Sequence, residues 1–127
     1  MIEELIKLSA QNDKLDQKRA EQRYFEMEWL IEELLSEVEE VKEELRPDNQ
    51  AFLEDELGDI LWGWLMLVQK LKSKGYVTSH EAILQRTLQK YAQRINALKG
   101  DENDAKRWAE VKAKQKTALE AERKRSN

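Results

Sequence analysis

The 127-residue sequence contains no cysteine, and this absence removes several kinds of chemistry. Without cysteine the chain can form neither a disulfide nor a thiolate zinc site, and it has no cysteine nucleophile. The longest apolar segment, Ile60 to Val68, is much shorter than the roughly 20 residues that span a bilayer. The first residues also lack the basic start and apolar core of a signal peptide. We therefore expect a cytoplasmic protein with no membrane partner.

Proline and glycine are also scarce, with one and four copies, so the chain has few residues that end helices. No stretch shows the alternation of apolar and polar residues, bounded by turns, that predicts strands. Glutamate, leucine, lysine and alanine, which favour helices, are abundant. Charged residues make up 38% of the chain, and the mean hydropathy is -0.84. The sequence thus predicts an all-α fold with a small core and a very polar surface.

Breaks in the helical pattern predict four or five helices joined by short loops, which is typical of a helical bundle. Pro47 ends the first pattern, and Gly75 and Gly100 end two others. The expected helices cover residues 1–45 (as one helix, or as two with a break near Ser9–Asp16), 48–74, 78–99 and 101–127, whose basic end is expected to fray. We expect residues 1–100 to form one domain and residues 101–127 to be its last helix and basic tail, or an appendage.

Charge is distributed unevenly along the chain. Residues 1–60 hold 19 acidic and 7 basic side chains, a net charge of -12, whereas residues 61–127 hold 7 acidic and 15 basic side chains, a net charge of +8. The asymmetry fits carboxylates that bind metal and cations that bind phosphate, although solvated helix faces are the simpler explanation of composition alone. The mainly charged segment 14–22 is expected to be exposed. Because the total charge is negative and aromatic residues are not interleaved with basic ones, we expect no nucleic-acid partner.

Two pairs of acidic residues share one spacing. Glu37 and Glu40 form an E-x-x-E, and Glu56 and Asp59 form an E-x-x-D. At 100° per residue each pair lies along the same edge of an apolar stripe, so an antiparallel hairpin would bring all four carboxylates to the margin of one seam. They would repel one another unless cations neutralised them, and oxygen ligands suit Mg²⁺ or Mn²⁺. A solvated acidic face explains either pair alone.

Gly63 lies on the acidic side of its predicted helix, about one turn beyond Asp59. A glycine inside a helix costs about 0.5–1 kcal/mol relative to alanine. Its presence therefore predicts that another helix or a ligand approaches the backbone closely at this point.

The two acidic segments resemble the signature helices of a known family. We find LLSEVEEVKEEL at residues 34–45 and LEDELGDILWGWLMLV at residues 53–68, separated around the acidic pairs by a fifteen-residue spacer. This pattern is similar to that of the all-α nucleotide pyrophosphohydrolases, the MazG-like superfamily that includes dCTP pyrophosphatase. The resemblance extends over about Trp29 to Ala97 and implies an oligomeric MazG-like bundle.

The resemblance also implies a reaction. It assigns Glu37, Glu40, Glu56 and Asp59 as catalytic metal ligands, with two or more Mg²⁺ ions that bridge the phosphates and activate a water to attack the α-phosphorus. The expected enzyme cleaves a (d)NTP to a (d)NMP and pyrophosphate and acts in nucleotide-pool cleaning. The alternative is a non-enzymatic helical interaction module whose acidic face binds a basic partner.

The sequence departs from the family at the residue before the first ligand. Several members carry a glutamate there as a proposed base, whereas this chain has Ser36. Glu33 or Glu39 would then substitute, or the metal ions alone would suffice.

Basic and aromatic residues supply candidates for binding the nucleotide. Arg86, Lys90 and Arg94 recur every four residues and share a helix face, which alone indicates a solvated basic stripe. The resemblance implies that Lys90 and Arg94 contact phosphate. It likewise implies a base-binding role for Trp29 and Phe25, for which core or dimer packing is the simpler explanation.

A second apolar patch, formed by Trp62, Leu65 and Met66, faces away from the main stripe of its helix. We interpret this patch as a subunit interface, and the resemblance implies a homodimer or homotetramer. His80, the only histidine, stands at a predicted helix start and is expected to have a capping or surface role.

Overall fold

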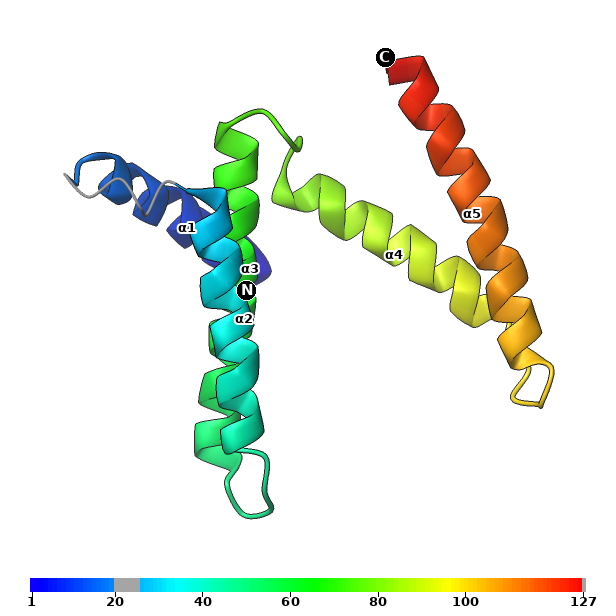
Figure 1. The fold of residues 1–127 in the computed structure, drawn as a ribbon, viewed down its shortest axis with the longest axis horizontal. Helices are drawn as coiled ribbons and strands as arrows, with labels where there is room; N and C mark the ends of the chain where they lie inside the picture. The colour runs from blue at the N-terminus through cyan, green and yellow to red at the C-terminus, as the bar shows by residue number, and fades with distance from the viewer. Residues whose placement is uncertain (20–25, 127) are drawn as a thin grey trace. The chain divides into compact units, whose positions relative to one another are not determined.

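The computed structural model describes residues 1–19 and 26–126, and this part of the chain contains helices and no strand. The five helices are α1 (Ile2–Gln17), α2 (Met27–Glu43), α3 (Gln50–Ser73), α4 (His80–Asn96) and α5 (Asp104–Ser126) (Figure 1). The predicted all-α class is confirmed. None of the helices described here combines the length and apolarity needed to cross a membrane.

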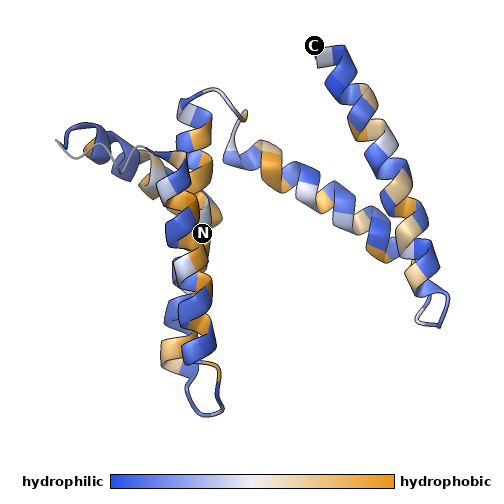
Figure 2. Cartoon of the chain, viewed as in Figure 1, coloured by the Kyte–Doolittle hydropathy of each residue, from blue (hydrophilic) through white to orange (hydrophobic). Residues whose placement is uncertain are grey.

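The chain divides into two compact units, Met1–His80 and Glu81–Asn127, which are described separately below. This division lies at the first residue of α4. The sequence places a boundary at residue 100, and that domain boundary stays a prediction. Figure 2 shows hydrophilic residues over most of α5.

Two predicted helix boundaries are wrong. The break expected near Ser9–Asp16 is absent because α1 continues to Gln17. The segment contains no proline or glycine, and the Ser9 hydroxyl donates to the Ile6 carbonyl 2.6 Å away without interrupting the helix. The basic end expected to fray is helical, because α5 continues to Ser126.

The first unit is built on an antiparallel hairpin of α2 and α3 (Figure 1). The turn between them uses a positive φ of 57° at Asp48, a conformation that aspartate tolerates better than most residues. The Asn49 amide donates to the Glu44 carbonyl at 2.8 Å, which satisfies one of the backbone groups that the end of α2 leaves unpaired.

The predicted close approach at Gly63 is confirmed. A Cβ atom added there would lie 3.0 Å from Leu34 Cδ1 and 3.7 Å from Leu34 Cα. The missing side chain therefore allows α2 and α3 to pack closely between the carboxylates and the buried end of the hairpin.

Helix α1 packs on the other side of α3 and covers the second apolar patch. Leu65 is fully buried and Met66 is 5% exposed within the single chain, so the predicted subunit interface at these two residues is wrong. The patch faces away from α2 because it belongs to the core between α1 and α3. Only Trp62 of the predicted patch keeps intermediate exposure.

A buried ion pair joins α1 to α3. The Lys70 ammonium lies 2.7 Å from Asp13 Oδ1, and both side chains are less than 5% exposed. Asp16, one turn further along α1, is also buried. The prediction that segment 14–22 is exposed is therefore wrong for Asp16, because Arg19, just after α1, and Lys70 on α3 compensate the burial of its carboxylate.

His80 is fully buried rather than at the surface, so the predicted surface role is wrong. Its Nε2 lies 2.9 Å from the Leu65 carbonyl oxygen, and its ring meets that of Trp64 edge-on at 6.0 Å. The histidine thus attaches the start of α4 to the middle of α3.

In the second unit, α4 and α5 are joined by polar and aromatic contacts around Arg94. Arg94 is 6% exposed, and its Nε donates to Gln115 Oε1 at 2.9 Å. Its guanidinium carbon lies 5.3 Å from the ring centroids of both Tyr91 and Trp108. These contacts stabilise the helix pair in place of a large apolar core.

We predict that Lys70→Ala lowers the free energy of unfolding by about 3–5 kcal/mol, because it leaves the Asp13 carboxylate buried without its ammonium partner. Urea unfolding at pH 7 measures the change. The exposed neighbour Lys72→Ala is the control and should change stability by less than about 0.5 kcal/mol. A loss at Lys70 no larger than the control's would contradict a stabilising role for the ion pair.

Candidate metal centre

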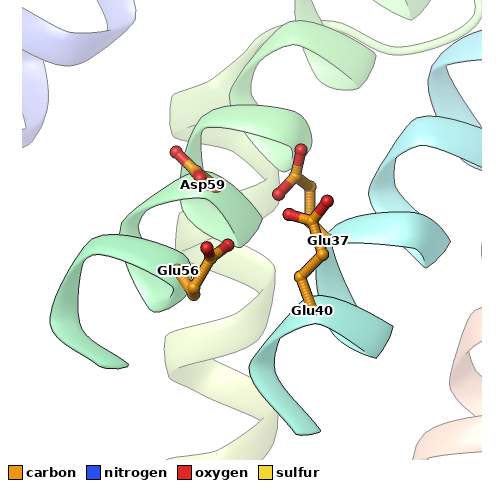
Figure 3. Close-up of side chains that lie close together, drawn as sticks. All are labelled: Glu37, Glu40, Glu56 and Asp59. Atoms are coloured by element: carbon orange, nitrogen blue, oxygen red, sulfur yellow. The ribbon is translucent and has the colours of Figure 1, made fainter. Parts of the chain in front are cut away.

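Helices α2 and α3 bring the two acidic pairs face to face. Glu37 and Glu40 come from successive turns of α2, and Glu56 and Asp59 come from successive turns of α3 (Figure 3). One carboxylate oxygen from each residue lies within 4.8 Å of the chosen oxygen of every other. The convergence predicted from helix phase is present, and the role of these residues as metal ligands stays a prediction.

The four carboxylates disturb one another's ionisation. Burial, hydrogen bonding with Glu40 and the charges of Glu40, Asp59 and Glu56 raise the pKa of Glu37 to about 7. Burial, followed by hydrogen bonding with Glu40, also raises the pKa of Glu56. In the metal-free protein the cluster therefore holds protons that isolated glutamates would have lost at neutral pH.

The donor set fits a hard divalent cation. Glu37 Oε2 and Glu56 Oε2 are buried and have no hydrogen-bond donor among the described residues. None of the four carboxylates forms an ion pair with a lysine or arginine of the described ranges, 1–19 and 26–126. A buried anionic oxygen without a donor is costly, and a cation held by carboxylate oxygens would remove that cost.

A cavity of about 290 Å³, here called the hairpin cavity, adjoins the carboxylates. Glu37 and Asp59 belong to its wall, so it opens directly onto the metal centre. Its other lining residues come from α1, the turn just after it, α2 and α3: Asn12, Asp16, Arg19, Trp29, Leu30, Glu33, Trp62, Gly63 and Met66. A ligand in this cavity would lie beside the carboxylates while contacting aromatic and amide side chains.

The hairpin cavity contains one of the two predicted base-binding residues. Trp29 lines it and is partly exposed, a placement that suits stacking on a planar group. Phe25 lies outside the described residues.

The predicted phosphate-binding residues belong to the second unit. Lys90 is exposed, and its Nζ lies 5.6 Å from the centroid of the Tyr91 ring. Arg94 is buried and contributes to the packing of α4 on α5. Their contact with phosphate stays a prediction.

Sequence reasoning missed the contribution of α1 to the hairpin cavity. Asn12 and Asp16 stand at positions i and i+4, which places them on one face of α1, and Arg19 follows just after the end of the helix. This spacing is a usable signal, but the charge of the segment led to the expectation that it was exposed.

The structure distinguishes the two residues considered as substitutes for a base at Ser36. Glu33 lines the hairpin cavity one helical turn before Glu37. Glu39 instead lies 3.1 Å from Lys42 on the exposed face of α2. Only Glu33 therefore shares a cavity with two of the candidate ligands.

Comparison with known families gives one match. The model of the MazG nucleotide pyrophosphohydrolase domain matches residues 25–98, which is more than half of the chain. The matched range contains both acidic pairs and leaves α1 outside it. No curated protein and no solved structure matches the chain.

Glu37→Gln should stabilise the metal-free protein at pH 8 by about 1 kcal/mol, because it removes a repelling charge that solvent only partly screens. The raised pKa makes ionisation of Glu37 oppose folding as the pH rises from 4.5 through about 7. The gain should thus vanish below pH 4.5. Thermal unfolding in EDTA at several pH values measures it.

The exposed Glu43→Gln, at the C-terminal end of the same helix, is the control for the loss of one negative charge. With excess Mg²⁺ the order should reverse, since the wild type gains stability from ion binding and Glu37→Gln loses a ligand. Equal melting temperatures for both variants in EDTA and in Mg²⁺ would rule out a repulsive cluster relieved by metal.

Proposed function

The chain belongs to the MazG nucleotide pyrophosphohydrolase family, and we propose that it hydrolyses nucleoside triphosphates to monophosphates and pyrophosphate with Mg²⁺ or Mn²⁺. The observation that carries this proposal is the cluster of four carboxylates, with two buried oxygens that lack donors, beside the hairpin cavity. We further propose deoxynucleoside triphosphates as substrates and nucleotide-pool cleaning in the cytoplasm as the role, without a nucleic-acid partner.

In this proposal Glu37, Glu40, Glu56 and Asp59 hold the metal. When bound, Mg²⁺ would neutralise phosphate oxygens and lower the pKa of an attacking water. The carboxylates are placed in advance by two packed helices, so little side-chain rearrangement is needed to form the site. Glu33 is the residue we propose to accept a proton, because it shares the hairpin cavity with Glu37 and Asp59.

Nucleotide binding would use cations for the phosphates and an aromatic side chain for the base. Lys90 is exposed and provides a point charge for the triphosphate. Arg94 already donates through Nε to Gln115, so we propose that it contacts phosphate through its remaining donors. Trp29 stacks on the base in the hairpin cavity, and Phe25 is proposed to assist it.

The proposed enzyme is a homodimer or homotetramer. In support, α4 carries an apolar stripe at positions i, i+4, i+7 and i+11 that α5, the other helix of its unit, does not cover fully. The exposed fractions are 37% for Leu84, 69% for Leu88, 43% for Tyr91 and 56% for Ile95. Such a stripe on a helix is typical of a surface that packs against another helix.

Activity is the direct test of the proposed function. With Mg²⁺, the wild type should release pyrophosphate and a monophosphate in equal amounts from at least one of the eight common NTPs and dNTPs. Glu56→Ala should lower kcat by at least about 10³-fold, because it removes a ligand of the metal that stabilises the transition state. Glu43→Ala, which changes an exposed glutamate, should keep wild-type activity.

Absence of metal-dependent release from all eight substrates would refute the enzyme hypothesis. It would favour the alternative of an interaction module with an acidic face. Release of inorganic phosphate without pyrophosphate would instead contradict attack at the α-phosphorus.

The oligomer has its own test. Light scattering after size-exclusion chromatography should give two or four times the chain mass of 15.0 kDa. Leu88→Glu combined with Ile95→Glu should lower the mass, because charges would enter the apolar stripe. Gln89→Glu on an exposed position of the same helix should leave it unchanged. A monomeric wild type would overturn the proposal.

A further inference from the structure

Helix α1 contributes a polar wall to the hairpin cavity. Asn12, Asp16 and Arg19 line the same space as the candidate ligands Glu37 and Asp59. A molecule held at the carboxylates through its phosphates would therefore bring its remaining part against α1. This inference rests on the proposed function, because it concerns how the same site chooses its substrate.

The hairpin cavity suits a flat ring with polar edges. Its volume of about 290 Å³ is at the lower end of the roughly 300–1,000 Å³ found for small-molecule sites, which favours one base over a whole nucleotide. Trp29, Trp62 and Met66 supply aromatic and thioether surface for its faces. The polar groups on α1 are then available for its edge.

Asp16 supplies a buried acceptor at this wall. Its side chain is only 7% exposed, and its Oδ1 accepts a hydrogen bond from Arg19 Nη1. An ionised carboxylate can only accept, and it has two oxygens with several acceptor positions. The edge of a base that binds beside Asp16 therefore has to carry a hydrogen-bond donor.

Asn12 supplies a donor with spare capacity. Its Nδ2 lies 3.5 Å from the Met66 sulfur, and a thioether is a weak acceptor. Asn12 lies one helical turn before Asp16, so its amide and the Asp16 carboxylate are neighbours on the helix face. Together they present an acceptor next to a donor.

We propose that Asp16 and Asn12 are specificity-determining residues that select a base carrying an exocyclic amino group next to a ring-nitrogen acceptor, as in cytosine and adenine. The amino group donates to Asp16, and the Asn12 amide donates to the ring nitrogen. A base with a carbonyl in place of the amino group turns an acceptor toward the carboxylate and leaves both groups without a donor, which is the strongest kind of discrimination a polar site offers. Both residues lie outside the segment matched by the family model, so family membership does not imply this choice.

Pairs of substrates that differ only at this position provide the test. The values of kcat/KM are compared for dCTP against dUTP and for dATP against dITP. The wild type should prefer the amino member of at least one pair by tenfold or more. Asp16→Asn, which is nearly isosteric and can donate to a carbonyl, should reduce that ratio at least tenfold.

Asn12→Ala should lower kcat/KM for the preferred amino substrate about tenfold while changing its carbonyl counterpart less. Gln11→Ala, an exposed amide on the same helix, should keep the wild-type ratio. A purely structural role of α1 would lower both members of a pair equally, and that result would overturn the inference, as would a wild type without preference. If Asp16→Asn does not fold, the ratio for Asn12→Ala decides.

The failure of this inference differs from that of the proposed function. A wild type that releases pyrophosphate but ignores the amino group refutes only the inference. If no substrate is hydrolysed, quenching of tryptophan fluorescence by dCTP and dUTP with Mg²⁺ replaces the rate. Amino-selective binding lost in Asp16→Asn would then support the inference without the activity, and absence of binding would refute both.

Discussion

Mutual repulsion among four carboxylates is the main constraint on the packing of the α2–α3 hairpin. Packing holds oxygens from four acidic side chains within 4.8 Å, and the raised pKa of Glu37 shows that the arrangement opposes ionisation. Close to the cluster, Gly63 lets α3 approach Leu34 of α2 tightly. In the proposed metal site, a bound cation would relieve the same repulsion that weakens the hairpin, so stability and metal binding would be linked.

The hairpin buries its apolar side chains mainly at one end, away from the turn between α2 and α3. The four buried apolar side chains among the described residues belong to the half of the hairpin away from its turn: Leu30, Leu65, Met66 and Val68. Toward the turn, apolar residues such as Val38, Leu57 and Phe52 are 40% exposed or more. The carboxylates lie between these regions. Helix α1, held by the Lys70–Asp13 pair, thus packs against α3 and supports the hairpin that carries the carboxylate cluster, although it contributes no carboxylate to that cluster.

Structural features that depend on residues close together in the sequence could be predicted from it, whereas features that depend on distant residues could not. The carboxylate cluster and the approach at Gly63 follow from helix phase and a short turn, which are local. The burial of Asp13 does not, because its partner is Lys70, more than fifty residues away. His80 shows the same limit, since its acceptor is the Leu65 carbonyl. Charge indicated exposure for Asp16 and helix position indicated it for His80, and both side chains are buried because α1 and the start of α4 pack against α3.

Asp16 is buried in the packing of α1 and also lines the hairpin cavity. A substitution there would therefore affect both stability and the proposed choice of substrate. It is buried near the Asp13–Lys70 pair, whose ammonium charge opposes the burial-driven rise in the pKa of Asp16. Removing its charge would leave more uncompensated positive charge beside Lys70. Asn12 lines the same cavity without taking part in an ion pair of the described chain. Changes of specificity that leave the fold intact are therefore expected to begin at Asn12, whereas a change at Asp16 needs compensation on α3.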